Sequence, residues 1–427
     1  MKKYMELYNY YRDRIVAGQL KEGDRMPSIR RTADSLGFSK TTVENAYFAL
    51  QADGYILAAP QSGYFVAYHR ELSAVKKEEE GYLPSSRQQS NARYDLSSGD
   101  ADRDSFDLKL WQRYIRNALR QEDRLCSYSD VQGEPDLREA LADYIREKRN
   151  VMTSPDRIVV GAGVQVLLNM LASLITERKT VSFPDGSFDQ GMSVFESYGY
   201  EVTTRNKDAD IIYVCPSHMT RFGDVMPIKR RMELVSYSAA RGSLVIEDDF
   251  DNDFLYASRP TPSLFALSAE GNVVYMGSFA NVLLPGIRIS FMVLPEPLHK
   301  AFQEKAHLFA QTASKTEQIA LTGFIRDGHI KSQIRKIRRH QTAKARAFYE
   351  QLHEAMPEFD CEVSENGLQV KLTLPYTGPV DRFREKGVSV YVDSYQNGIL
   401  KLMLSPSALT QAEIPLAVQA LKEAIYE

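Results

Sequence analysis

The sequence predicts an α/β protein in two parts: an N-terminal winged helix-turn-helix and a larger domain built around a mostly parallel sheet. Three helical patterns and a short hairpin pattern fill the first 70 residues. Beyond a polar stretch, strand-like and helical segments alternate, which is typical of an α/β domain with a mostly parallel sheet. The chain has 427 residues, of which 43% are apolar and 26% are charged, so it is long enough for two or three folded units.

The N-terminal segment has the element order of a winged helix-turn-helix. Its second helix begins where Ser28 can cap it and ends at Gly37, and its third opens at Ser39, whose hydroxyl can also cap. Two short strands follow, joined by a stretch with turn chemistry, and these predict a hairpin, or wing. The expected elements are helices over residues 4–18, 28–37 and 39–54 and strands over residues 55–57 and 64–66.

The same segment is the candidate for binding double-stranded DNA. Residues 1–70 hold ten Lys and Arg against seven Asp and Glu, a net charge of +3, whereas the whole chain is at −3. The first turn of the third helix would face base edges in the major groove, the second helix would hold the DNA backbone, and the wing would enter the minor groove. Any one of these residues could simply be solvated, but their order and spacing favour DNA binding. The candidate DNA-binding residues are Arg30, Arg31, Ser39, Lys40, Thr41, Thr42, Gln61 and Gly63.

A polar linker separates this segment from the rest of the chain. Residues 71–93 include the charged run 76–80 and are nearly free of core residues. The sequence therefore predicts a winged helix DNA-binding domain over residues 1–70, a linker over 71–93, and an α/β domain over 94–427. We refer to the first as the head and to the last as the body.

Several loops of the body follow predicted strands and suggest a common pocket, because ligands of parallel sheets bind at the C-terminal strand ends. Residues 161–163 can bring backbone amides to an anion, and residues 247–251 offer carboxylates to a ligand cation. Ser278 and Arg288 can supply a hydroxyl and a guanidinium to a phosphate. The simpler interpretation of residues 161–163 is a tight turn, and that of residues 247–251 is a solvated acidic turn. The expected body elements are helices over residues 108–120, 136–148 and 165–176 and strands over 157–160, 180–183, 211–215, 244–248, 272–276 and 289–294.

Ordered motifs in both parts resemble known families. The head resembles the GntR-type winged-helix signature in four stretches: Pro27–Arg30, Leu36–Tyr47, Gly54–Ile56 and Gly63–Val66. From about residue 94 to the C-terminus, the chain resembles the fold-type I aminotransferases. The matching stretches are Asp107–Trp111, Tyr128–Gly133, Leu137–Leu141, Pro216–His218, Ile246–Asp249 and Leu284–Arg288. The whole chain is therefore similar to the MocR-type regulators, which join a GntR-type head to an aminotransferase-like body.

This resemblance implies a site for pyridoxal phosphate. In such a site Asp248 would pair with the pyridine nitrogen, Ser278 and Arg288 would hold the phosphate, and Phe188 would stack on the ring. The candidate residues of a residual cofactor site are Gly163, Phe188, His218, Asp248, Ser278, Asn281 and Arg288.

Asn281 takes the place where the family has the lysine that forms the internal aldimine. An amide nitrogen cannot form that bond, because its lone pair is delocalised into the carbonyl. Phe250 and Val164 likewise replace a tyrosine and a hydroxyl residue of the family. We therefore expect no catalytic residue, and pyridoxal phosphate or a related ligand only in a non-covalent complex. A displaced lysine, Lys315, is the alternative amine, and a solvent-facing lysine at a helix start is its simpler interpretation.

The sequence thus predicts a cytoplasmic transcriptional regulator that binds DNA through its head, forms a homodimer through its body, and can take a small-molecule effector. Two alternatives remain: a DNA-tethered, pyridoxal phosphate-dependent aminotransferase that uses another lysine, and a body that is only a ligand-free dimerisation scaffold. No membrane partner is expected, because no apolar run approaches the roughly 20 residues that cross a bilayer. No metal or disulfide is expected either, because Cys126, Cys215 and Cys361 lack the spacing of such sites.

Overall fold

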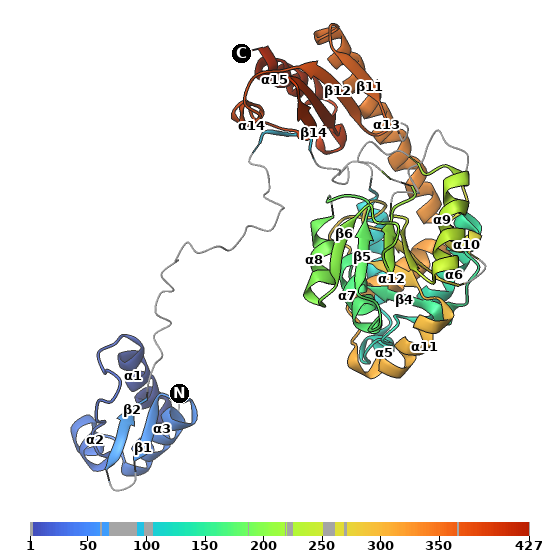
Figure 1. The fold of residues 1–427 in the computed structure, drawn as a ribbon. Helices are drawn as coiled ribbons and strands as arrows, with labels where there is room; N and C mark the ends of the chain where they lie inside the picture. The colour runs from blue at the N-terminus through green and yellow to red at the C-terminus, as the bar shows by residue number, and fades with distance from the viewer. Residues whose placement is uncertain are drawn as a thin grey trace. The chain divides into compact units, whose positions relative to one another are not determined.

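The computed structural model describes residues 3–59, 62–67, 92–97, 106–186, 188–217, 219, 225–250, 261–268, 271–364 and 367–426. The chain divides into two compact units, Met1–Gln88 and Gln89–Glu427 (Figure 1). No helix within the described ranges is long and apolar enough to span a membrane.

The first unit is the predicted three-helix domain with a hairpin. Val43, Tyr47 and Leu50 of its third helix are fully buried and pack against Leu7 and Ile56, so the third helix forms the centre of this small core. The elements are α1 (Lys3–Val16), α2 (Ile29–Leu36), α3 (Lys40–Ala52), β1 (Ile56–Ala59) and β2 (Gly63–Val66).

Serine caps begin the second and third helices. The Oγ of Ser28 accepts a hydrogen bond from the N–H of Arg31, and the Oγ of Ser39 accepts one from the N–H of Thr42, each at 3.2 Å. Gly37 ends α2 with a φ of +70°, a left-handed conformation that glycine adopts without strain. Both predicted caps and the predicted helix end are confirmed.

A seven-stranded sheet forms the centre of the second unit, in the order β4-β10-β9-β8-β7-β5-β6. All strand pairs from β9 to β6 are parallel, whereas β10 is antiparallel to both its neighbours. The predicted mostly parallel sheet is confirmed. The chain turns back at β10 because residues 279–289 are too few for a parallel crossover. The strands are β4 (Ile158–Gly161), β5 (Thr180–Phe183), β6 (Glu201–Thr204), β7 (Ile211–Val214), β8 (Leu244–Asp248), β9 (Val273–Ser278) and β10 (Ser290–Val293).

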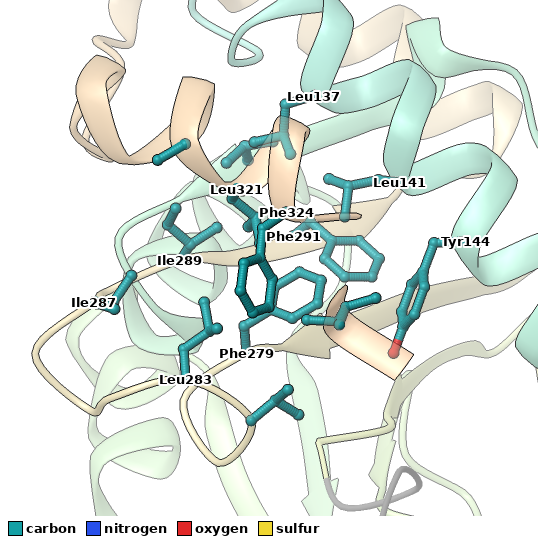
Figure 2. Packing of buried hydrophobic residues seen from close by; sticks show 14 of the residues in the cluster. Leu137, Leu141, Tyr144, Phe279, Leu283, Ile287, Ile289, Phe291, Leu321 and Phe324 are labelled. Carbon is teal, nitrogen blue, oxygen red and sulfur yellow. The ribbon is translucent and has the colours of Figure 1, made fainter. Parts of the chain in front are cut away.

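Helices cover both faces of this sheet. Val159, Ile246 and Met292 point to one face and pack against α7 and α8, while Val160 and Phe291 point to the other and pack against α4, α6 and α12 (Figures 1 and 2). Burial on both faces explains why the strands read as continuous apolar runs. The helices of this part are α4 (Leu108–Leu119), α5 (Glu122–Leu125), α6 (Pro135–Arg149), α7 (Val164–Leu174), α8 (Asp189–Ser197), α9 (Ile228–Arg241), α10 (Leu264–Leu267), α11 (Glu296–Lys305) and α12 (Lys315–Arg326), with 3₁₀ turns η1 (Pro155–Arg157) and η3 (Ala306–Leu308).

A second, antiparallel sheet follows in the last quarter of the chain and was not anticipated from the sequence. Its strand order is β11-β12-β15-β14, and it shares a core with β3, the second half of α13 and α15. The two-residue strands β3 and β13 pair in parallel and tie the start of the body to this sheet. The elements are β3 (Tyr94–Asp95), α13 (His329–Ala355), β11 (Asp360–Val363), β12 (Val370–Pro375), α14 (Asp381–Glu385), β13 (Val388–Ser389), β14 (Tyr391–Gln396), β15 (Ile399–Leu404), η4 (Pro406–Ala408) and α15 (Ile414–Tyr426).

Candidate DNA interface and candidate ligand site

The first turn of α3 presents the predicted DNA-binding residues to solvent. Lys40 and Thr41 are exposed and Thr42 is half-buried. Ser39 fixes this turn, because its Oγ lies 2.8 Å from the Oγ1 of Thr42 and also accepts the Thr42 N–H. The turn therefore combines a lysine, a hydroxyl and the partial positive charge of a helix N-terminus, which suits an anionic partner.

The two predicted arginines of α2 are exposed beside a shallow depression of about 420 Å³. Arg30 and Arg31 line it together with Ser28, Asp34 and Ser35. Among the residues that the structure describes, neither guanidinium forms an ion pair, so both can meet phosphate oxygens.

The wing has a third strand-like segment that was missed at the sequence level. The N–H of Met26 donates to the carbonyl of Tyr64 at 2.8 Å, and Arg25 forms an antiparallel bridge with Phe65. This places the Arg25 guanidinium over the hairpin, because a Cβ added to Gly63 would lie 3.8 Å from both its Nε and its Nη2. Arg25 thus brings positive charge to a wing that has little of its own. The sequence does hold a signal for this strand-like segment, because Met26 precedes a proline and such a residue favours extended backbone. Gln61 lies outside the described residues.

In the body, strand register brings three predicted site positions to one edge of the sheet. Ser290, the first residue of β10, pairs with Gly161 at the end of β4 and with Ser278 at the end of β9. The Oγ of Ser290 donates to the Oγ of Ser278 at 3.0 Å. Asp248 ends β8 at the same edge, opposite Met276. Ligands of such sheets bind at this edge.

The guanidinium of Arg288 lies against the loop that begins α7. A Cβ added to Gly163 would be 2.6 Å from its Nη2, and Gly163 has a φ of +106°, so this position requires glycine. The Ala162 N–H donates to the Oγ1 of Thr312 at 3.0 Å, a contact that sequence reasoning missed. Arg288 and the N-terminus of α7 together form a cradle for an anion.

Asp248 lies in a buried aromatic setting. The hydroxyl of Tyr213 donates to the Oδ2 of Asp248. Burial, and then the charge of Asp248, raise the pKa of Tyr213 far above its usual value, so Tyr213 remains a donor. The ring of Phe188 packs on that of Tyr213, with centroids 5.6 Å apart, and Phe183 stacks on the same ring at 4.8 Å. Two predicted residues, Phe188 and Asp248, therefore meet through Tyr213, which was not predicted.

Asn281 lies on a hydrogen-bonded turn between β9 and β10. The carbonyl of Phe279 accepts from the N–H groups of Val282 and Leu283, at 3.1 and 2.8 Å. All three of these side chains are buried, and Figure 2 shows Phe279 and Leu283 in the apolar cluster with Phe291. The half-buried Asn281 is therefore held in place by its neighbours, and its amide cannot act as an amine.

Lys315 begins α12, but it does not face solvent as the sequence suggested. Its ammonium donates to the carbonyls of Arg124, Ser127 and Tyr128, at 2.8, 2.9 and 3.2 Å, and its side chain is only 13% exposed. The carboxylate of Glu134 lies 3.6 Å away. Lys315 therefore holds the turn after α5, and this explains its burial.

Glu247 and Asp249 are committed to structure, which corrects the expectation that these two carboxylates meet a ligand, whereas Asp251 lies outside the described residues. Glu247 accepts the N–H groups of Leu264 and Phe265 at the start of α10, at 2.8 and 2.9 Å. Asp249 is bound by the buried Arg149, whose Nε lies 2.7 Å from its Oδ2. Of the three carboxylates at positions 247–249, only that of Asp248 points toward Tyr213 and the candidate site.

Asp249 also ties together several loops near the site. The hydroxyls of Ser217 and Tyr275 donate to its carboxylate at 2.7 and 2.8 Å. His218, the next predicted residue, lies outside the described residues. Within the described ranges, no three or more His, Cys, Asp or Glu side chains are grouped as a metal site requires.

Comparisons with known proteins agree with this two-part architecture. Residues 3–66 match the family model of bacterial regulatory proteins of the gntR family, and residues 93–377 match that of aminotransferase class I and II. The chain is 31% identical to the HTH-type transcriptional regulator YdeL of Bacillus subtilis, over 91% of this chain and 88% of that protein. It is 27% identical to the probable rhizopine catabolism regulatory protein MocR of Rhizobium meliloti, over 88% of this chain and 82% of that one.

Among solved structures, an archaeal alanine:glyoxylate aminotransferase superposes with a TM-score of 0.68 at 21% identity. The match covers 78% of this chain and 90% of the enzyme. At this identity the likeness establishes the fold of the body.

Proposed function

Because this chain belongs to the family of HTH-type transcriptional regulators that join a gntR-type head to an aminotransferase class I and II body, we propose that its body pairs two DNA-binding heads and holds a small ligand without covalent chemistry. The chain is a DNA-binding regulator. A cytoplasmic location belongs to this proposal, since a regulator works where the DNA is.

The exposed cations of the head support its assigned role. Lys40 lies at the capped start of α3, Arg30 and Arg31 are exposed on α2, and Arg25 lies at the wing. Phosphate contacts of this kind supply most non-specific affinity for DNA.

Pyridoxal phosphate is the cofactor that the fold of the body implies, and the residues present fit it in part. Arg288 and Ser278 would hold its phosphate, Asp248 would face its ring nitrogen, and Phe188 would contact its ring. The glycine at position 163 supports this fit, because any side chain there would displace the Arg288 guanidinium. When bound to a lysine amine, this group supplies an electron sink for amino acid chemistry.

The single observation that carries the non-enzymatic proposal is Asn281 on its fixed turn. The side chain can donate and accept hydrogen bonds, but it cannot condense with the aldehyde of the cofactor. Lys315 is a poor replacement, because its ammonium already has three carbonyl acceptors and a nearby carboxylate. If the Lys315 ammonium moved to the cofactor, the three carbonyls and the Glu134 carboxylate would lose the cation that they now contact.

A ligand titration tests this proposal. Pyridoxal phosphate should raise the melting temperature of the full chain, because a ligand of the folded state stabilises that state. It should leave no protein adduct after borohydride treatment and should dialyse away. A borohydride-stable adduct on Lys315 would instead establish the enzyme alternative. No thermal shift with pyridoxal phosphate, pyridoxine phosphate or free amino acids would leave the body as a scaffold.

Pairing of the heads is the second part of the proposal. Two heads on one dimer read paired half-sites, and each then gains effective concentration from the other. Sedimentation of the full chain should give twice the mass of one chain at micromolar concentration, and a stable monomer would contradict the proposal. An effector would act by binding two arrangements of the dimer unequally.

A further inference from the structure

The outward face of α3 carries a stripe of four exposed side chains. Thr41, Glu44, Asn45 and Phe48 all face solvent, and Phe48 is 74% exposed. At 3.6 residues per turn, these positions lie on one side of the helix, opposite its buried residues. The buried residues of α3 are Val43, Ala46, Tyr47 and Leu50.

The spacing of this stripe is that of a helix lying along the major groove. In the homeodomain, for example, the helix in the major groove reads bases with residues at positions i, i+3, i+4 and i+7. Thr41, Glu44, Asn45 and Phe48 have this spacing. The stripe extends the contact surface beyond the first turn of α3, which supplies Lys40 and the helix N-terminus.

We propose that this stripe reads bases, and that Asn45 and Phe48 together recognise A·T pairs. An asparagine amide can accept a hydrogen bond from the N6 amino group of adenine through its oxygen and donate one to N7 through its nitrogen, and an aromatic ring can contact the methyl group of thymine. Asn45 and Phe48 are three residues apart, a rise of about 4.5 Å along the helix. Base pairs repeat every 3.4 Å or so, and the two side chains therefore meet the same or neighbouring pairs.

The charges of the surface agree with this division of roles. The cations lie outside the stripe, on α2, at the wing and at Lys40, where they can hold phosphates. The stripe itself carries a carboxylate, Glu44, which phosphates repel. A carboxylate suits a base edge, because it can accept from the amino group of cytosine.

A protein partner is the competing occupant of this surface. Asn45 and Phe48 also border a groove of about 470 Å³ on the side toward α1. The remaining residues that line the groove are Tyr4, Ala49, Ala52 and Asp53. The i, i+3, i+4, i+7 stripe includes residues outside this groove, Thr41 and Glu44, which favours DNA.

This inference rests on the proposed DNA binding of the head, and a selection experiment separates the two. Duplexes with a random central region are selected on the full-length wild type and on the full-length variants Asn45→Ala and Phe48→Ala. The wild type should select a motif with A·T pairs. Each variant should lose its preference at one of those pairs, while its affinity for non-specific duplex stays unchanged. On the selected site, Asn45→Ala should bind roughly 5- to 150-fold more weakly.

Single-atom changes in the DNA give a sharper test. Replacing the selected thymine by uracil removes only the methyl group, which should weaken wild-type binding roughly fourfold and leave Phe48→Ala unaffected. Replacing the selected adenine by 7-deazaadenine removes only N7, which should weaken the wild type and leave Asn45→Ala unaffected. Val16→Ala is the matched control, since Val16 is an exposed apolar residue at the end of α1. It should select the wild-type motif.

The outcomes are distinct. A wild type that binds no duplex overturns the proposed function and this inference with it. A wild type that binds DNA, with both variants selecting the same motif as the wild type, overturns the inference alone. A Phe48→Ala variant whose sedimentation changes while its base preference does not would assign Phe48 to a protein contact and would also overturn it. The variants change exposed side chains, and equal melting curves would show that they fold.

Discussion

The Arg288 guanidinium and the Gly163 backbone are in such close contact that no side chain fits between them. A Cβ at Gly163 would lie 2.6 Å from the Nη2 of Arg288 and 3.1 Å from its Cζ. The φ of +106° and ψ of +163° at Gly163 add a second constraint, because this region of conformational space is almost confined to glycine. The lack of space for a side chain and the backbone conformation thus both require glycine at position 163, at the start of α7, where the candidate anion cradle lies.

Gly163→Ala should therefore lower the stability of the body by about 1–3 kcal/mol and abolish the thermal shift caused by pyridoxal phosphate. The measurement is urea unfolding of the full chain, with and without the ligand. Gly186→Ala is the matched control, because no atom lies within 4 Å of its added Cβ and its φ is not positive. Equal free energies of unfolding for the two variants would show that the Arg288 side chain and the backbone accept the added methyl group without loss of stability.

Asn281→Lys should restore covalent binding of pyridoxal phosphate. The new amine would sit on the turn fixed by Phe279 and Leu283, at the position that we propose corresponds to the family's lysine. We expect visible-range absorbance and a borohydride-stable adduct in the variant and neither in the wild type. Asn281→Gln, which keeps an amide, should behave as the wild type does. An adduct of equal yield in all three proteins would contradict the assignment of position 281.

Breaking the buried pair of Arg149 and Asp249 should be among the most costly changes in the body. Both side chains are at least 95% buried, and Asp249 is also bound by Ser217 and Tyr275. Arg149→Met would leave an uncompensated buried carboxylate, and such changes cost about 3–5 kcal/mol. Arg146→Ala, which breaks an exposed pair with Asp143, should cost under about 1 kcal/mol. Denaturant midpoints of the two variants compare these costs directly.

Glu247 should make the stability of the body depend on pH in the acidic range. Burial, and then the charge of Asp249, raise the pKa of Glu247 from 4.5 to about 7. Between these values the folded state binds more protons than the unfolded state, so its stability falls as pH rises through the window and is level above pH 7. The Glu247→Gln side chain cannot ionise, so this variant lacks the pH-dependent contribution of Glu247 to the free energy of unfolding. The stability of the wild type relative to Glu247→Gln should therefore fall by about 3 kcal/mol from pH 4.5 to pH 7. A constant difference across that range would contradict the raised pKa.

Arg25→Ala and Lys40→Ala should each weaken binding to all duplexes about equally. Each would remove one phosphate contact, so the slope of log affinity against log salt should fall by roughly 1. Arg14→Ala is the control with the same loss of charge, since Arg14 lies on α1 and packs over the ring of Tyr10. If Lys40→Ala instead lost affinity only for one base at one position, Lys40 would contact a base and not a phosphate.

Local signals in the sequence account for much of the head. The caps at Ser28 and Ser39 and the helix end at Gly37 depend on a few neighbouring residues, so sequence spacing was enough to locate them. The alternating pattern of the body likewise predicted its mostly parallel sheet, because apolar runs and turns repeat along the chain. The inability of Asn281 to form an imine can also be predicted from the sequence, since the chemistry of an amide does not depend on the fold.

Contacts between distant residues account for what the sequence did not reveal. Arg25 reaches the wing across 38 positions of sequence, Tyr213 reaches Asp248 across 35, and Thr312 reaches Ala162 across 150. No periodicity or motif encodes such contacts, because each depends on how separate elements pack.

Lys315 shows most clearly the difference between what the sequence predicts and what packing decides. Its sequence position, at a helix start, predicted a solvated lysine, whereas packing of α12 beside the turn after α5 gave its ammonium three carbonyl acceptors. The amino-acid sequence by itself determined which groups this protein possesses, including the amide at position 281. Only the tertiary structure decided which of those groups meet, because buried polar atoms take partners from whichever segments the packed core brings within hydrogen-bond distance.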